Sequence, residues 1–435
     1  MSMPASKTAP PTAPARRLGP RPLPLHLSAA ALTWTSSSGA LPLLRQGSPL
    51  LKAETRTRSR GVAAAALRER LGASDPEAFA EALTRRARAR ALAMLDGILA
   101  YRGHPYRRDL PPVPTVWSEG SCRLLDYGPA AVPAPEIPVL LVPSLVNRAY
   151  ILDLEAGTSL VRWLAGRGLR PYLVDWDRPG SAERGFSLTD YIAGRLESAL
   201  DAVRARHAAK PLLVGYCMGG LLALALALRR RDDLAGLALL ATPWDFHADA
   251  GQSAALAAAA AVVMGPALDT LGELPIDAIQ ALFASLDPLQ AARKFIDFSR
   301  LDPASRKAVL FVALEDWLND GVPLTAPVAR ECLLGWYGEN SPARGRWRIA
   351  GRPVDPGTLE LPSLCMIPAQ DRIVPPASAA ALGAAIPGAE VLRPASGHIG
   401  MIVSGGAKAR VWSPLAEWLL ARAQVPAPGK KVKNS

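Results

Sequence analysis

The sequence of 435 residues predicts an α/β fold, a mostly parallel sheet with helices on both faces. Short apolar runs alternate with helical stretches between about residues 139 and 393. Such runs are typical of parallel strands that are buried on both faces. A glycine-rich turn at 215–220 joins one apolar run to a helical run, and a long helical stretch at 245–358 interrupts the alternation. The stretch at 245–358 predicts a helical cap insertion.

The first 110 residues precede the predicted sheet. Residues 1–25 are rich in Pro, Ala and Thr, which indicates a disordered leader. Residues 26–110 are predicted to be a helical N-terminal region, although the pattern at 26–60 is ambiguous. The sequence Ser-Asp-Pro-Glu at 74–77 is a helix start signal, because it places a capping side chain before Pro and an acid in the first turn.

Residues 111–425 are expected to form the α/β domain, and 426–435 a solvated basic tail. Proline-rich segments bracket a possible hairpin at 115–127, and the last predicted helix is 411–424. The predicted strands are Val139–Val142, Pro171–Asp175, Leu212–Tyr216, Leu234–Ala241, Ser363–Pro368 and Glu390–Arg393.

The formal net charge is +12, with 50 basic and 38 acidic residues. This excess favours an acidic partner such as a nucleotide-bearing substrate, or it reflects Arg on solvated helix faces. No sequence motif of a nucleic-acid-binding protein is present, so we expect no nucleic acid partner.

Four Cys occur without a CxxC pair or zinc spacing, so no metal site is predicted. The N-terminus lacks the pattern of a secretory signal, and the apolar run 254–264 is too short to cross a bilayer. We therefore expect a cytoplasmic protein with no transmembrane segment.

The turn reads Gly215-Tyr216-Cys217-Met218-Gly219 and lies between a predicted strand and a predicted helix. Strand, Gly-x-nucleophile-x-Gly and helix form the nucleophile elbow of the α/β-hydrolase fold. A thiol in that position predicts acyl transfer through an acyl-thioester enzyme. The alternative is a buried structural Cys beside turn glycines.

A thiol needs a base, and the chain order in this fold is nucleophile, acid, His. Of five His, only His398 follows the last predicted strand, 181 residues after Cys217. Asp371 follows the preceding strand and would fix the tautomer of the His398 ring. The alternatives are a surface-loop His and a turn carboxylate.

Two N–H groups are expected to form an oxyanion hole. One is that of Met218, directly after the nucleophile. The other comes from the loop after the first core strand, where Pro143 lacks an N–H, so Ser144 or Leu145 is the expected donor.

The chain resembles the polyhydroxyalkanoate synthases over about residues 125–425. The stretches that carry the resemblance are Val142–Leu154, Tyr172–Pro179, Gly215–Gly220, Thr242–Phe246, Asp371–Pro375 and Gly397–Ile399. The resemblance implies that Cys217, Asp371 and His398 form the catalytic triad. It implies that 3-hydroxyacyl-CoA is the substrate, that CoA is released and that no cofactor is needed. It also implies a storage-granule surface as a partner, and a homodimer is possible.

The chain departs from the family pattern at Arg372, at Leu221, in Pro143-Ser144 and in the N-terminal region. A cytoplasmic α/β-hydrolase that uses the same triad, such as an esterase, thioesterase or hydroxyalkanoate depolymerase, is therefore the alternative. A non-enzymatic granule protein is a third hypothesis. A synthase needs a dry acyl path, and apolar and aromatic residues of the insertion could line it. They are Leu282, Phe283, Phe295, Phe298, Phe311, Trp317, Trp336 and Trp347.

Overall fold

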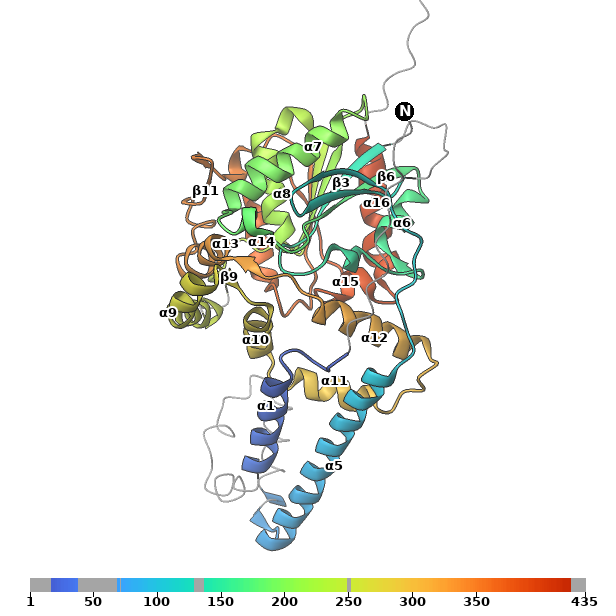
Figure 1. Cartoon of the computed structure of the whole chain (residues 1–435), viewed down its shortest axis with the longest axis vertical. Coiled ribbons are helices and arrows are strands. Elements are labelled where there is room, and N and C mark those ends of the chain that lie inside the picture. Colours follow the sequence, from blue (N-terminus) through green and yellow to red (C-terminus); the bar gives the residue numbers. More distant parts are fainter. Residues whose placement is uncertain (1–16, 38–68, 71, 129–136, 249–251, 424–435) are drawn as a thin grey trace, which may run out of the picture. The chain divides into compact units, whose positions relative to one another are not determined.

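The computed structural model describes residues 17–37, 69–70, 72–128, 137–248 and 252–423 (Figure 1). The chain divides into two compact units. The first contains described residues up to Tyr106 together with Asp287–Val312, and the second contains Arg107–Leu286 and the described residues from Ala313 onward. Most of the leader predicted at 1–25 and the whole tail predicted at 426–435 lie outside the described residues.

The second unit is built on an eight-stranded sheet with the order β1-β2-β6-β3-β7-β8-β13-β14. Strands β6, β3, β7, β8, β13 and β14 are parallel, whereas β1 and β2 form an antiparallel hairpin on the edge. The mostly parallel sheet and the hairpin were both predicted and are confirmed. The strands are β1 (Thr115–Glu119), β2 (Cys122–Asp126), β3 (Ile137–Val142), β6 (Leu169–Asp175), β7 (Leu212–Tyr216), β8 (Gly236–Leu240), β13 (Ser363–Met366) and β14 (Glu390–Leu392).

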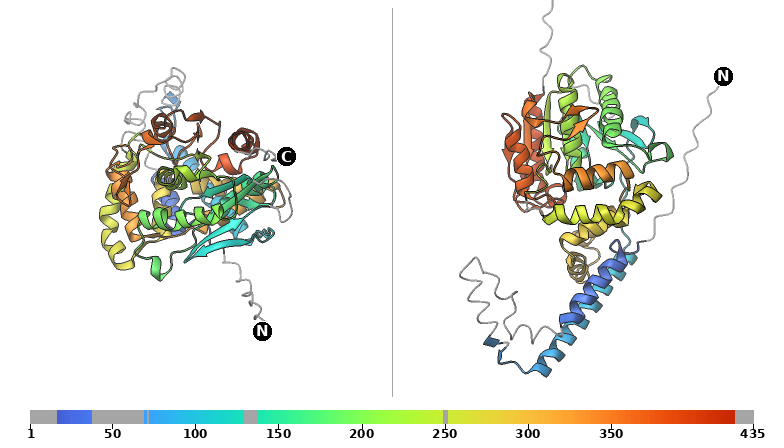
Figure 2. Two further views of the ribbon diagram at one scale, coloured as in Figure 1. Left: turned by 90° about the horizontal axis from the view of Figure 1, so that it is seen from above. Right: turned by 90° about the vertical axis from the view of Figure 1, so that its left-hand side faces the viewer.

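Helices cover both faces of this sheet. Figure 2 shows α7 (Glu197–Arg204) and α8 (Met218–Arg229) on one face and α16 (Ser413–Arg422) on the other. All residues of α8 from Met218 to Ala227 are buried, because its Leu and Ala side chains face both the sheet and neighbouring helices. Shorter helices complete the layers: α6 (Leu160–Ala165), α14 (Pro376–Ala385), α15 (Gly400–Val403) and η8 (Lys408–Trp412). The predicted α/β-hydrolase architecture is thus present.

The remaining elements are short and lie between these strands and helices along the chain. They are η2 (Ala149–Leu152), β4 (Asp153–Glu155), β5 (Thr158–Ser159), η3 (Ser181–Glu183), η4 (Asp190–Leu196), η5 (Arg231–Asp233), β9 (Glu273–Leu274), β10 (Leu324–Thr325), β11 (Arg348–Ile349), β12 (Arg352–Pro353) and η7 (Pro356–Thr358).

The insertion predicted at 245–358 is helical but is shared between the two units. In the second unit it supplies α9 (Gln252–Leu271), α10 (Ile276–Leu286), α13 (Ala326–Arg330) and η6 (Glu331–Gly338). Trp336 and Trp347 meet at 5.3 Å between ring centroids, and Phe246 stacks on Trp336 at 5.8 Å. These rings belong to the same buried cluster as the sheet.

The first unit consists of α1 (Leu23–Ser36), α5 (Pro76–Gly103), α11 (Gln290–Phe298) and the start of α12 (Arg306–Asn319). The predicted start signal is confirmed, because the Asp75 carboxylate accepts a hydrogen bond from the Ala78 N–H at 2.8 Å. Helix α1 begins inside the range predicted as leader, so that boundary moves before Leu23. Phe295, Phe298 and Phe311 pack in the core of this unit, so the expectation that they line an acyl path is wrong. None of the helices in the described ranges is long and apolar enough to cross a membrane.

Candidate active site

The turn after β7 places Cys217 in a strained backbone conformation. Its φ of 57° and ψ of −128° lie where a residue with a Cβ rarely sits. The Cys217 N–H donates to the Leu240 carbonyl at 2.9 Å, and the Gly220 N–H donates to the Cys217 carbonyl at 2.9 Å. These bonds hold the turn from both sides, and the thiol is half-buried at the start of α8.

The glycines around the thiol are required by close packing. A Cβ on Gly219 would lie 2.1 Å from the Val142 carbonyl oxygen, and one on Gly220 would lie 1.8 Å from Thr242 Oγ1. A Cβ on Gly215 would lie 2.5 Å from the Gly220 Cα. Only glycine lets β3, β7 and α8 approach this closely, which explains the pattern that the sequence showed.

Asp371 and His398 meet at the ends of the last two parallel strands. His398 Nδ1 lies 2.7 Å from Asp371 Oδ2, and both residues are buried. The other carboxylate oxygen, Oδ1, accepts from the Ile373 N–H at 2.8 Å and the Val374 N–H at 2.9 Å. Because Oδ1 is held by two backbone donors, Oδ2 stays turned toward the imidazole and fixes its Nδ1–H tautomer.

The Cys217 side chain lies within hydrogen-bond reach of His398. Burial alone lowers the pKa of His398, but the negative charge of the Cys217 thiolate and the hydrogen bond to Asp371 raise that pKa to about 10. A thiolate at Cys217 therefore favours the protonated His398 ring, with the Asp371 carboxylate on the other side of the ring. The structure thus brings together the three residues that the chain order predicts.

The other four His side chains have different partners. The Nε2 atoms of His26, His104 and His247 bond to main-chain carbonyls of Arg21, Pro303 and Tyr337, and His207 Nε2 bonds to the Tyr172 hydroxyl. All five His lie in the described ranges, and His398 pairs there with the Asp371 carboxylate.

The predicted oxyanion donors lie in two neighbouring segments. A Cβ on Gly219 would also lie 2.6 Å from the Pro143 carbonyl, so the loop after β3 passes beside the first turn of α8. Met218 is the first residue of that helix, where N–H groups have no intrahelical partner. In the described part of the chain, the Ser144 and Leu145 N–H groups donate to no main-chain carbonyl. Their role as oxyanion donors remains a prediction.

Two positioning contacts were not predicted from the sequence. The Tyr216 hydroxyl donates to the His398 carbonyl at 3.1 Å, and the Trp176 indole N–H donates to the Pro143 carbonyl at 3.1 Å. Burial raises the pKa of Tyr216 well above its ordinary value, so this hydroxyl keeps its proton and remains a donor. Tyr216 lies directly before Cys217 at the end of a strand, and this position is the sequence feature from which its contact with the site could have been predicted.

The remaining three thiols differ from Cys217. Cys122, Cys332 and Cys365 are buried, and burial raises the pKa of each thiol. Within the described residues, no group of three metal-ligating side chains is close enough to hold a metal ion.

Comparisons with known proteins agree with the fold. The α/β hydrolase fold family matches residues 137–404. The poly(3-hydroxyalkanoate) polymerase subunit PhaC of Synechocystis sp. is 32% identical over 320 residues, which cover 72% of this chain and 85% of the relative. The subunit of the same name from Thiocystis violacea is 30% identical, and the match covers 88% of its length. The subunit from Cupriavidus necator is also 30% identical, and the match covers 50% of its length. The chain therefore belongs to the α/β-hydrolase fold family and, within it, to the poly(3-hydroxyalkanoate) polymerase PhaC family.

Proposed function

We propose that this protein is an acyltransferase that polymerises 3-hydroxyacyl-CoA into polyhydroxyalkanoate, with the growing chain carried as a thioester on Cys217 and with release of CoA. The observation that carries the proposal is the half-buried thiol at the strained elbow, within reach of an imidazole held by a buried carboxylate. Membership of the polymerase family selects the reaction among those that such a triad can perform.

In the first step the Cys217 thiolate attacks the thioester carbonyl of 3-hydroxyacyl-CoA. The carbonyl oxygen becomes an oxyanion, which the N–H groups of Met218 and of Ser144 or Leu145 would stabilise. The tetrahedral intermediate then expels the CoA thiolate, which takes the proton from His398 and leaves as CoA-SH. The acyl group remains on Cys217, and His398 is neutral.

In the second step neutral His398 removes the proton from the hydroxyl of a hydroxyacyl unit. That oxygen attacks the acyl-Cys217 thioester, an ester bond forms and the Cys217 thiolate leaves. The imidazolium and the thiolate are restored. When the attacking unit is 3-hydroxyacyl-CoA, the extended chain is held as its CoA thioester and returns to Cys217 by the first step, so each cycle forms one ester and releases one CoA. Asp371 acts through His398, because it keeps the ring tautomer and stabilises the imidazolium.

Burial of the site favours transfer to a hydroxyl over hydrolysis. His398 is 7% exposed and Asp371 is 6% exposed, so little water reaches the base. The cap elements of the second unit contribute Leu282, Phe283, Trp336 and Tyr337 to the apolar cluster that also includes Cys217. An acyl-enzyme in such surroundings should persist long enough to meet a second hydroxyacyl unit. Acyl-CoA and the polyester surface are the partners that this reaction requires.

The test is to give the purified full chain 3-hydroxybutyryl-CoA and to follow CoA, free acid and polymer together. We expect CoA release after a lag, an insoluble polyester and little free 3-hydroxybutyrate. Mass spectrometry of digested enzyme should find the hydroxybutyryl group on the Cys217 peptide.

Cys365→Ala is the matched control, because it removes a buried thiol from β13 of the same sheet and should keep turnover, whereas Cys217→Ala should abolish it. Free acid equal to released CoA, with no polymer, would replace the synthase by the hydrolase.

A further inference from the structure

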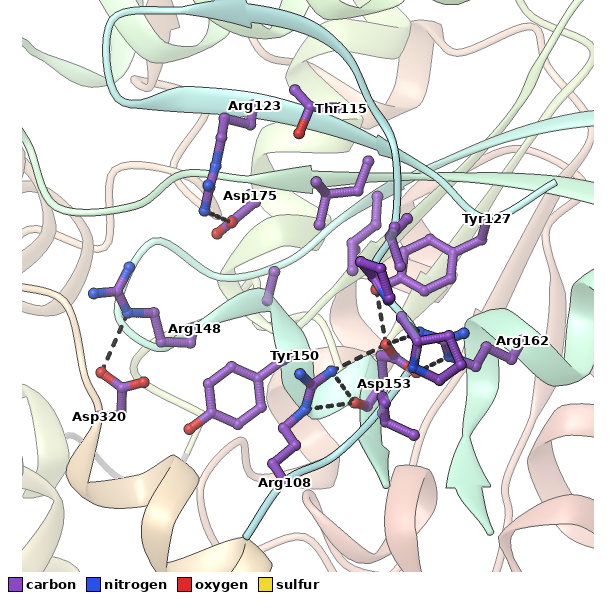
Figure 3. A pocket seen from close by; sticks show the side chains of 17 residues that line it. Arg108, Thr115, Arg123, Tyr127, Arg148, Tyr150, Asp153, Arg162, Asp175 and Asp320 are labelled. Carbon is purple, nitrogen blue, oxygen red and sulfur yellow. Dashed lines mark hydrogen bonds and ion pairs between the residues drawn. The ribbon is translucent and has the colours of Figure 1, made fainter. Parts of the chain in front are cut away.

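A pocket of about 370 Å³ lies in the second unit and is separate from the three candidate catalytic residues. Figure 3 shows its wall of arginine, tyrosine and aspartate side chains. They come from the segment before β1, from the β1–β2 hairpin, from the residues that follow β3, from β6 and, for Asp320, from just after α12. None of Cys217, Asp371 and His398 lines it.

At one end of the pocket two guanidinium groups share a single carboxylate. Asp153 is fully buried and binds Arg108 at 3.0 Å and Arg162 at 2.8 Å. The Tyr127 hydroxyl also donates to Asp153, at 3.0 Å. This end therefore carries one more positive than negative charge, and Arg108 remains 37% exposed to the pocket mouth.

At the other end two more arginines are paired with carboxylates. Arg123 binds Asp175 at 2.6 Å and Asp177 at 3.6 Å, and Arg148 binds Asp320 at 3.3 Å and also Asp177. Three carboxylates face two arginines here, so this end carries one more negative than positive charge. These pairs place the guanidinium groups of Arg123 and Arg148 along the same cavity as Arg108 and Arg162 (Figure 3).

The pairing leaves hydrogen-bond donors unused on all four arginines. Among the described residues, no partner is found for Nη1 of Arg108, Arg123 and Arg162 or for Nη2 of Arg148. Arginine has hydrogen-bond donors and no acceptor, so the unused hydrogen-bonding groups of these arginines are N–H donors. A ligand that completes it must bring several acceptor oxygens.

The rest of the wall is apolar. It is formed by Leu110, Pro111, Pro112, Val113, Leu125 and Leu173. A ligand that only neutralised the arginines would leave this side unused, and a purely apolar ligand would leave the guanidinium donors unpaired.

We propose that this pocket binds an organic phosphate, with its phosphate oxygens on the guanidinium donors and a small apolar body against the Leu110–Val113 wall. The excess positive charge lies at Arg108 and Arg162, where a tetrahedral, multiply charged phosphate can accept from both guanidinium groups, whereas one arginine fork satisfies a carboxylate. The proposal stands on the pocket alone and does not depend on the polymerase reaction.

Binding can be measured by calorimetry on the full chain in a phosphate-free buffer of moderate salt. Phenyl phosphate should bind at one site and more tightly than inorganic phosphate, which lacks the apolar body, and than benzoate, which lacks the phosphate. Absence of saturable binding of phenyl phosphate, or equal binding of benzoate, would overturn the proposal.

Arg108→Gln and Arg123→Gln should each weaken phenyl phosphate binding by about tenfold or more, the usual effect of losing a charge-assisted hydrogen bond. Arg162 keeps Asp153 paired in the first variant, so the fold should survive, which thermal unfolding would verify. The matched control is Arg231→Gln, which breaks an exposed ion pair with Glu360 outside the pocket and should leave binding unchanged. Equal affinity in all three variants would contradict the assignment.

A free organic phosphate and the phosphates of CoA share the same chemistry. Free CoA that displaces phenyl phosphate from wild type would identify the pocket as a subsite for the CoA group, whereas no displacement would identify a separate phosphate ligand. Both outcomes support the site, and the Arg108→Gln and Arg123→Gln results decide whether it exists.

Discussion

Cys217 and Cys365 come from strands of one sheet, β7 and β13, which both pair with β8. Cys217 follows the end of its strand in a left-handed turn, is half-buried and lies beside His398. Cys365 lies within its strand, is 3% exposed and has a pKa that burial raises to about 12. The same thiol is thus a candidate nucleophile in one place and an inert core group in the other.

The difference indicates that the position of a thiol relative to the end of its strand, and not its residue type, makes it a candidate nucleophile. Inside a parallel strand both faces are covered, so a side chain there meets only other side chains of the core. Past the strand end, the backbone can turn sharply, the thiol meets the N-terminus of a helix, and loops from neighbouring strands deliver an acid and a base. The predictions below test that contrast, beginning with the largest expected effect.

Replacing the candidate base His398 should remove most of the reactivity that is expected of the Cys217 thiol. His398→Ala should lower acyl transfer from 3-hydroxybutyryl-CoA by on the order of 10² to 10⁴, the usual contribution of a positioned general base. The measurement is initial CoA release at saturating substrate, with circular dichroism and thermal unfolding as controls for the fold. Turnover close to wild type would rule out His398 as the base.

Asp371→Asn should be damaging through the orientation of the ring. The Asn carbonyl oxygen can still accept from the Ile373 and Val374 N–H groups, but its NH₂ group then faces His398 Nδ1 and disfavours the Nδ1–H tautomer. We expect kcat to fall on the order of 10²-fold or more with little change in KM. Steady-state kinetics give both constants, and a change confined to KM would mean that Asp371 contacts substrate instead.

Thiol alkylation compares the four cysteines directly. Cys217 should react with iodoacetamide faster than Cys122, Cys332 and Cys365 by on the order of 10² or more, because the thiolate is the reacting form and burial disfavours it at the other three. Peptide mapping over time gives each rate in the folded protein. In His398→Ala the difference in alkylation rate between Cys217 and the other three thiols should become smaller. If Cys217 of the wild type reacts as slowly as those three, it is not the nucleophile.

The smallest effect is expected in stability at alkaline pH. The pKa of His398 is about 10 in the folded protein against an ordinary value of 6.5, so the folded ring keeps a proton that the unfolded chain loses. The stability from this proton is complete below pH 6.5 and is lost as the pH rises through about 10.

Cys217→Ala removes the charge that raises this pKa most, so its free energy of unfolding should fall less between neutral and alkaline pH. Chemical denaturation across this range measures both proteins. Equal slopes for the variant and wild type would contradict the coupling between the thiolate and the imidazolium.

The local pattern of the sequence was sufficient to predict the nucleophile elbow and to select His398 from the five His. The glycines at 215, 219 and 220 are needed where three backbones nearly touch, and such a requirement is visible in residue types. Chain order selected His398 and Asp371 because parallel strands deliver their carboxyl-end loops to one edge of the sheet. The sequence therefore predicted the three residues that the structure brings together, Cys217, Asp371 and His398.

Tertiary structure decided what depends on packing between distant segments. Apolar periodicity reports that a helix is buried but does not name its neighbour, so nothing local in residues 287–312 separates them from the rest of the insertion. The structure groups them with α1 and α5 in the first unit, and three Phe residues expected near the acyl path lie in that core.

The arginine pocket was equally hidden in the sequence. Its four guanidinium groups come from positions between 108 and 162, and a charge count cannot separate them from arginines on solvated helix faces. By itself the sequence determined the sheet, the elbow and the order of the catalytic candidates, because each follows from short-range backbone geometry. Only the tertiary structure decided the two units, the Tyr216 contact to His398 and the pocket, because these depend on which buried faces and side chains meet.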